Sequence, residues 1–277
     1  MASKRTLSTF EKSYSKSPEG QERITQLRKQ LAHFSAAAPA FIIPTDNEIT
    51  FGVVSCSHLG SLYANLSGLV EFYKTAKREG AEFILHCGDV CDGAKMYKGQ
   101  EYEQSAIGWE AQAKCFEDNA PGDLPTHFIT GNHDESLKKL AGMDPGSDLA
   151  RRRPDWKLIG SCTGRVVLDA GNGKSCIVDL MHPGGGSSYA VSYRPQKIVE
   201  QLEGGTKPNM LFIGHFHKAE WMPAYRNVCV AQSGCLQWQT PYMRDKGLAA
   251  HVGGWIVKVR MGDNCNMFAG SFVAFYR

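Results

Sequence analysis

The sequence predicts an α/β protein in which a largely parallel sheet is followed by a second sheet. From residue 49 to residue 130, short apolar runs alternate with helical stretches, the order that is typical of a parallel sheet flanked by helices. Beyond residue 166 the apolar runs continue with fewer helical stretches between them, which indicates the second sheet. The chain has 277 residues, 42% of them hydrophobic, and this suffices for a sizeable core.

The pattern assigns each element in turn. In the first half we expect strands at 49–55, 83–87 and 126–130 and helices at 67–78 and 102–116. In the second half we expect strands at 166–168, 176–181, 211–213, 228–231 and 255–259. Residues 46–277 are therefore expected to form the main domain.

Residues 1–45 show no strand pattern and are expected to form a helical extension. Ser17, Pro18 and Glu19 are typical of the start of a helix. One narrow apolar stripe follows at helical spacing, formed by Ile24, Leu27, Leu31 and Phe34. We expect this helix to pack on the main domain, and a contact with a partner or a second copy is the alternative.

Composition excludes several classes of protein. The formal net charge of +3 is too small to indicate a nucleic-acid binder by itself. The first residues form no apolar signal segment, and no apolar run reaches the roughly 18–20 residues that span a bilayer. We therefore expect a cytoplasmic protein without a membrane partner, whose nine cysteines are reduced thiols.

Side chains of metal-binding type follow five of the apolar runs. They are Cys56, His58, Asp89, Asn132, His182, His215 and His217. Because functional sites of open α/β sheets form at the carboxyl ends of the strands, we expect these side chains to lie close together. Imidazole, carboxylate and amide oxygen together suit a divalent ion such as Mn²⁺, Fe²⁺ or Zn²⁺. The sequence therefore predicts a metal site.

The same series resembles the calcineurin-like metallophosphoesterase family, whose motifs are Asp-x-His, Gly-Asp, Gly-Asn-His-Asp/Glu, His and Gly-His-x-His. The match runs in the same order from about residue 49 to residue 217, and residues 188–197 resemble the phage and prokaryotic branch. The resemblance implies that residues 46–277 form a metallophosphoesterase domain. It also implies a four-layer αββα sandwich of mixed sheets, with two divalent metal ions at the sheet edge.

The resemblance also implies a role for each matching residue. One ion would take Cys56, His58, Asp89 and His217, and the other would take Asp89, Asn132, His182 and His215, with Asp89 shared. The family's reaction is attack of a metal-activated hydroxide on phosphorus. His133 would stabilise charge on the phosphate and assist the leaving group, and Asp134 would orient His133.

Cys56 departs from the family pattern, which has aspartate there. Three interpretations remain open. Cys56 binds a metal ion as a thiolate and favours zinc or iron, or it does not bind and leaves the first site weak. The third is an oxidisable thiol near Cys87 and Cys91.

Substrate contacts are less clearly indicated. Arg194 could meet an anionic substrate and Tyr242 could stack on a base, whereas solvated surface and core packing are the simpler interpretations. Taken together, the sequence and the resemblance predict a dinuclear metal-dependent phosphodiesterase acting on a nucleotide or nucleic acid. The alternatives are a phosphomonoesterase and a degenerate metal-binding member that acts as an interaction protein.

Overall fold

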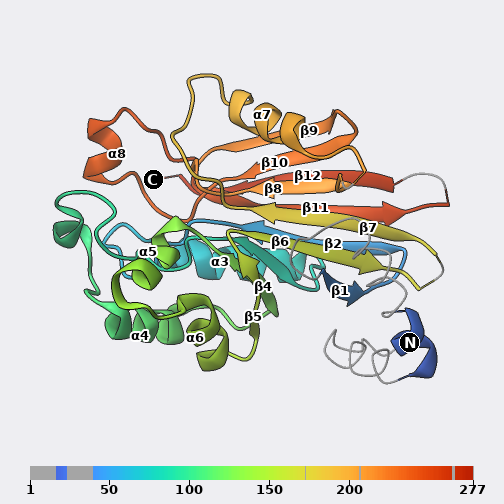
Figure 1. Ribbon diagram of the computed structural model, residues 1–277, viewed down its shortest axis with the longest axis horizontal. Coiled ribbons are helices and arrows are strands. Elements are labelled where there is room, and N and C mark those ends of the chain that lie inside the picture. Colours follow the sequence, from blue (N-terminus) through green and yellow to red (C-terminus); the bar gives the residue numbers. More distant parts are fainter. Residues whose placement is uncertain (1–16, 24–39, 172, 206, 264–265, 277) are drawn as a thin grey trace.

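Two six-stranded mixed sheets pack face to face, and helices cover both outer faces (Figure 1). The computed structural model describes residues 17–23, 40–171, 173–205, 207–263 and 266–276. Helix α7 lies on one outer side, and helices α3, α4 and α6 lie on the other. The predicted four-layer αββα sandwich is therefore confirmed.

The first sheet has the order β12-β11-β2-β3-β4-β5. Its strands are β2 (Glu48–Val54), β3 (Ile84–Cys87), β4 (Thr126–Thr130), β5 (Trp156–Ser161), β11 (Gly253–Met261) and β12 (Asn266–Ala274). Strands β2 to β5 run parallel, and the hairpin β11–β12 pairs antiparallel with β2. The helices beside this sheet are α3 (Leu66–Arg78), α4 (Trp109–Asn119), α5 (Asn132–Ala141) and α6 (Pro145–Arg152).

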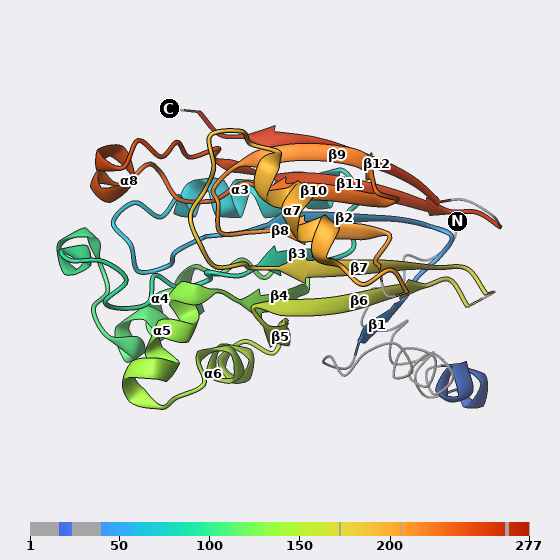
Figure 2. The same cartoon turned by 45° about the horizontal axis from the view of Figure 1, so that its top comes forward.

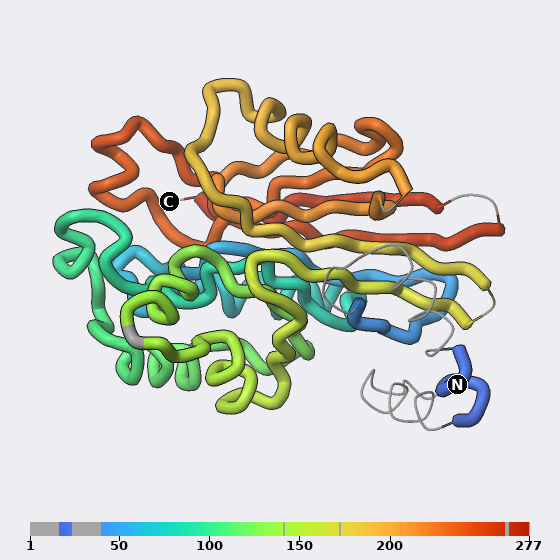
Figure 3. Tube along the Cα trace, viewed as in Figure 1, coloured from blue at the N-terminus to red at the C-terminus, as the bar shows by residue number. Residues whose placement is uncertain are grey.

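The second sheet has the order β1-β6-β7-β8-β10-β9. Its strands are β1 (Phe41–Pro44), β6 (Thr163–Asp169), β7 (Ser175–Met181), β8 (Met210–Ile213), β9 (Ala219–Tyr225) and β10 (Val228–Ser233), and α7 (Tyr193–Gln201) covers it. Figure 3 traces how the chain completes the second sheet before β11 and β12 return to the first. The short elements η1 (Gln100–Glu103) and α8 (Pro241–Asp245) lie in connections.

Two expectations about elements were wrong. The predicted helix 102–116 is divided, because Gly108 has φ 84° and α4 begins only at Trp109. Strand β1 lies inside the segment that was expected to be helical, where it pairs parallel with β6. Residues 18–23 are helical as expected, and all four residues of the predicted apolar stripe lie outside the described residues.

The main core lies between the two sheets. Phe51 of β2 stacks on Phe83 with ring centroids 5.2 Å apart and meets Phe212 of β8 edge-on at 6.1 Å. All three side chains are fully buried. A second core lies between the first sheet and its helices, where Phe72 and Phe116 pack near Trp156. Among the described residues, no helix has the length and apolar character needed to cross a bilayer.

His127 of β4 is buried in an apolar part of this framework. Its ring lies 4.7 Å from that of Phe41 and 5.7 Å from that of Phe83, centroid to centroid. Neither ring nitrogen has a hydrogen-bond partner among the described residues. Burial, with a smaller effect of Lys157, lowers the pKa of His127 to about 3.

We therefore expect His127 to make folding sensitive to acid. Its ordinary pKa is 6.5, so the unfolded chain binds a proton that the folded chain excludes. The stability is present above pH 6.5 and falls by about 2 kcal/mol on reaching about pH 5. Urea unfolding of the protein and of His127→Leu at neutral pH and at about pH 5 measures the difference. Equal loss of stability in both proteins would contradict this assignment.

Candidate metal centre

Five strands bring the predicted ligands to one edge of the sandwich. Cys56 and His58 follow β2, Asp89 follows β3, and Asn132 begins the helix after β4. From the second sheet, His182 follows β7, and His215 and His217 follow β8. The structure brings these strand ends together. The predicted ligands that line one cavity are His58, Asp89, Asn132, His215 and His217, and the ligand atoms of Cys56 and His182 lie within 4.8 Å of that of Asp89.

The backbone at this edge is unusual. Nine described residues other than glycine have positive φ, and the predicted ligands Cys56, His58, Asp89, His215 and His217 are five of them, with φ between 46° and 76°. Such a conformation costs roughly 1–2 kcal/mol per residue for side chains other than glycine. Backbone strain of this kind concentrates at functional sites, where it fixes the direction of side chains.

Glycines at the strand ends make room for the ligands. A Cβ atom at Gly131 would collide with the carboxylate of Asp89. At Gly88, where φ is 86°, a Cβ atom would lie 2.6 Å from Nδ1 of His182. Larger residues at these positions would displace the side chains that the site requires.

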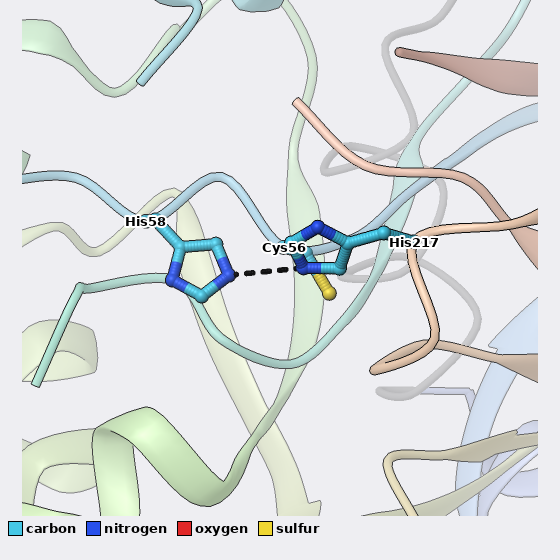
Figure 4. A group of neighbouring side chains, drawn as sticks. All are labelled: Cys56, His58 and His217. Atoms are coloured by element: carbon cyan, nitrogen blue, oxygen red, sulfur yellow. Dashed lines mark hydrogen bonds between the residues drawn. The ribbon is translucent and has the colours of Figure 1, made fainter. Parts of the chain in front are cut away.

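Cys56, His58 and His217 form the first group of candidate ligands (Figure 4). Their ligand atoms lie within 4.8 Å of one another, and Nε2 of His58 is 3.3 Å from Nε2 of His217. Nδ1 of His58 is 3.3 Å from Oδ1 of Asp92, although it forms no hydrogen bond among the described residues, and Nε2 of the ring faces His217. Burial, followed by the neighbouring His58, lowers the pKa of His217 well below its ordinary value. A neutral ring has a free lone pair for a cation.

Cys56, Asp89 and His182 form the second group. Nε2 of His182 lies 3.0 Å from Oδ2 of Asp89 and 3.0 Å from Oδ1 of Asn132. Nδ1 of His182 donates to the carbonyl of Cys87 at 2.7 Å, so Nε2 is the nitrogen that can bind a metal ion. Burial opposes the ionised form of Asp89, but His182 and His133 outweigh it and lower the pKa of Asp89 well below its ordinary value.

The sulfur of Cys56 belongs to both groups. Its Sγ accepts a hydrogen bond from the His215 amide at 3.3 Å and lies 3.0 Å from the Ser55 hydroxyl. Burial, followed by the charge of Asp89, raises the pKa of the Cys56 thiol well above its ordinary value. Cys56 is therefore a fully buried thiol close to both groups and does not lie on an exposed, reactive surface. None of the described cysteines forms a disulfide.

Asp89 and His215 complete the site. Oδ2 of Asp89 is 3.9 Å from Nε2 of His58 and 3.0 Å from Nε2 of His182, so this carboxylate lies between the two groups. His215 packs beside His182 with ring centroids 5.2 Å apart. Nε2 of His215 is 2.6 Å from the carbonyl of Gly185, which leaves Nδ1 for a metal ion.

The expected contact between Asp134 and His133 is not the one found. The carboxylate of Asp134 accepts hydrogen bonds from the amides of Val90, Cys91 and Gly131 at 2.8–3.1 Å. The orienting partner of His133 is Asp92, whose carbonyl lies 2.6 Å from Nδ1 of His133. Three backbone amides thus donate hydrogen bonds to the carboxylate oxygens of Asp134. Asp134 therefore stabilises the loop that carries Asp89.

A cavity of about 370 Å³ opens above the ligands. Tyr242, the predicted substrate contact, lines this cavity, and so does His133. Arg194 does not line it: its guanidinium donates to the carbonyl of Gly184 at 2.8 Å and lies 5.2 Å above the ring of Phe216. Arg194 thus holds the glycine loop in place.

Two residues of the site were missed from the sequence. Asp92 orients His133 through its carbonyl and lies beside His58, and these three residues also form a third group of candidate ligands within 4.8 Å. The position of Asp92, three residues after Asp89, is the sequence feature that could have indicated its role. Tyr97 lines the cavity from a loop whose sequence carried no motif.

The donor set fits divalent metal ions. Two imidazole nitrogens that face each other at 3.3 Å cannot both carry a proton there, and a cation between them satisfies both lone pairs. Carboxylate, amide oxygen, imidazole and thiol within one small volume are ligands for zinc or iron-like ions.

The chain belongs to the calcineurin-like phosphoesterase family. The sequence model of that family matches residues 49–219, a span that contains every predicted ligand together with His133 and Asp134. The family and the clustered ligands agree with the resemblance that the motifs indicated.

Relatives and solved structures extend this comparison. The DNA polymerase II small subunit of Halobacterium salinarum is 25% identical over 249 residues, which cover 75% of this chain and 47% of that protein. The chain thus spans about half the length of the curated relatives it matches. The structure is similar to 5′-nucleotidase from Candida albicans (12% identity, TM-score 0.41, 87% of this chain and 53% of the other). It is also similar to Vps29 from Chaetomium thermophilum (11% identity, TM-score 0.40, 82% and 96%).

Proposed function

We propose that this chain is a metal-dependent phosphodiesterase that hydrolyses a nucleotide or nucleic-acid ester. One observation carries the proposal: His58, Asp89 and His217, which belong to the two groups of candidate ligands, line a single cavity together with His133. A phosphate in that cavity would meet both the metal ligands and a proton donor.

The chain's residues would hold two divalent ions, of Mn²⁺, Fe²⁺ or Zn²⁺. Cys56, His58, Asp89 and His217 would hold one, and the other would be held by Asp89, Asn132, His182 and His215. Bound in this way, a pair of divalent ions clamps a phosphate and makes water a nucleophile near neutral pH.

His133 would protonate the leaving oxygen. Its Nδ1 faces a carbonyl, which only accepts, so Nδ1 carries a proton and Nε2 is the nitrogen that can serve the substrate. Burial lowers the pKa of His133, although Asp89 and Asp92 oppose this by favouring the charged ring. The protonated ring is the form that can donate to an alkoxide.

Two considerations favour a nucleotide or nucleic-acid diester. An alkoxide leaving group requires an acid, and His133 supplies one. The relative in Halobacterium salinarum carries the name of a DNA polymerase subunit. A phosphomonoesterase uses similar groups, and a non-catalytic binding protein is the alternative that the replacement of aspartate by Cys56 favours.

Hydrolysis of bis(p-nitrophenyl) phosphate and of p-nitrophenyl phosphate, each with Mn²⁺ or Zn²⁺, tests the proposal. We expect a higher kcat/KM for the diester and loss of turnover in Asp89→Asn, which keeps the size of the side chain but removes its charge. Faster turnover of the monoester would identify a phosphomonoesterase. No turnover of either ester, even in Cys56→Asp, would contradict an enzymatic function.

A further inference from the structure

Two tyrosines form a flat aromatic surface in the wall of the cavity. The rings of Tyr97 and Tyr242 stack with centroids 4.1 Å apart and planes 14° from parallel. Tyr97 precedes η1 and Tyr242 belongs to α8, two segments at the same end of the molecule (Figures 1 and 2). Both rings line the cavity that holds the metal ligands. We call this pair the tyrosine platform.

Hydrogen bonds to Glu103 hold the tyrosine platform in place before any ligand binds. Its Oε2 accepts a hydrogen bond from the Tyr97 hydroxyl at 2.8 Å, and its Oε1 accepts one from the Tyr242 amide at 3.3 Å. Tyr97 is half-buried, whereas Tyr242 remains 36% exposed and therefore presents ring surface to a ligand. A surface held in place before binding loses little freedom when a ligand stacks on it.

The rest of the cavity wall has the character of a site for a neutral, flat ring. Met96, Met243 and Leu248 supply apolar contacts, and the buried Gln237 and Thr240 supply polar groups. Among the described residues the lining contains no lysine and no arginine, so the charged groups of this wall lie at the end with the candidate ligands. A nucleoside monophosphate unit has this division, with one phosphate at one end and an uncharged heteroaromatic base with polar edges at the other.

We propose that the tyrosine platform binds the nucleobase of the substrate while the phosphate lies at the metal ligands. The proposal rests on the proposed phosphodiesterase function and specifies its substrate class. Stacking of a base on an aromatic side chain tolerates different bases, so the platform selects nucleosides and not a particular sequence.

Four esters with the same p-nitrophenyl leaving group test the platform: methyl p-nitrophenyl phosphate, phenyl p-nitrophenyl phosphate, and the 5′ and 3′ isomers of thymidine p-nitrophenyl phosphate. We expect the KM of one thymidine isomer to lie about 5-fold to 150-fold below that of the methyl ester. In Tyr242→Ala the ratio of the methyl-ester KM to the thymidine-ester KM should fall toward one. Tyr242→Phe, which keeps the aromatic ring, should retain the wild-type ratio. Tyr189→Ala removes a fully exposed tyrosine outside the cavity and is the matched control.

Each other outcome is decisive. A thymidine ester no better than the methyl ester, or a ratio unchanged in Tyr242→Ala, would overturn the proposal while leaving the phosphodiesterase intact. An equal gain for the phenyl ester would show that the platform binds any aromatic ring. If no ester is hydrolysed, calorimetric binding of thymidine 5′-monophosphate against inorganic phosphate to the Zn²⁺-loaded protein takes the place of KM. The ratio of the two dissociation constants, in the wild type and in Tyr242→Ala, then supports or overturns base binding by the platform. The proposed phosphodiesterase function would in that case be wrong.

Discussion

Replacing His133 with alanine is expected to slow hydrolysis of a diester with an alkoxide leaving group by about 10²–10⁴-fold. The same change should slow a p-nitrophenyl ester much less, because p-nitrophenolate leaves without a proton. His133 is suited to this role because its Nδ1 is held by the carbonyl of Asp92 at 2.6 Å and its ring lines the cavity. Single-turnover rates for a dinucleotide and for a p-nitrophenyl diester measure the two effects.

The metal content of His133→Ala distinguishes a proton donor from a ligand. His133 also belongs to the group formed with His58 and Asp92, so a ligand role is the competing interpretation. Wild-type metal content with a selective loss on the alkoxide leaving group would support the proton donor. A variant that loses metal, or that slows both esters equally, would contradict it.

Cys56 is expected to give the protein a preference for thiophilic ions. Its sulfur lies within 4.8 Å of the ligand atoms of both groups, so a bound cation would take it as a thiolate. Titration with Co²⁺ should therefore produce a near-ultraviolet thiolate-to-cobalt absorption band. Cys56→Ser should lose the band, and Cys56→Asp should reduce the preference for Zn²⁺ over Mn²⁺ by about tenfold or more.

Cys235 provides the matched control for Cys56. It is buried in the same small cluster with Val252 but belongs to neither ligand group. Cys235→Ser should therefore keep both the absorption band and the metal preference. A band that persists in Cys56→Ser would assign the sulfur ligand to another cysteine and leave Cys56 a packing residue.

The sequence predicted those helices and strands whose hydrophobic pattern fits only one type of secondary structure. The helix expected at 67–78 is found at Leu66–Arg78, where Asn65 caps its first turn through the Gly68 amide. Strands β2, β3 and β4 were predicted because central strands of a parallel sheet are apolar on both faces. Edge strand β12 alternates between exposed and half-buried residues, and its apolar pattern is too weak to find from sequence.

The sequence predicted which residues make up the candidate site, but it did not predict which of them contact one another. The ligands could be found because strand ends in both sheets meet at one edge. Which carboxylate holds which histidine depends on how the loops fold back, and short-range spacing does not encode this. Asp134 is next to His133 in sequence, yet its oxygens bind three amides, while Asp92 reaches His133 through its backbone carbonyl. Arg194 likewise donates a hydrogen bond to the glycine loop and does not line the cavity.

The positive φ values of five candidate ligands, which lie at the ends of β2, β3 and β8, bear on how an ion would exchange at this centre. The sheets hold Cys56, His58, Asp89, His215 and His217 in these conformations, and the folded chain meets that cost before any ion arrives. We therefore expect that a bound ion could leave and another could enter without refolding of the loops. Donor chemistry and the supply of each ion, and not the cost of folding the loops, would then decide which ion the centre holds.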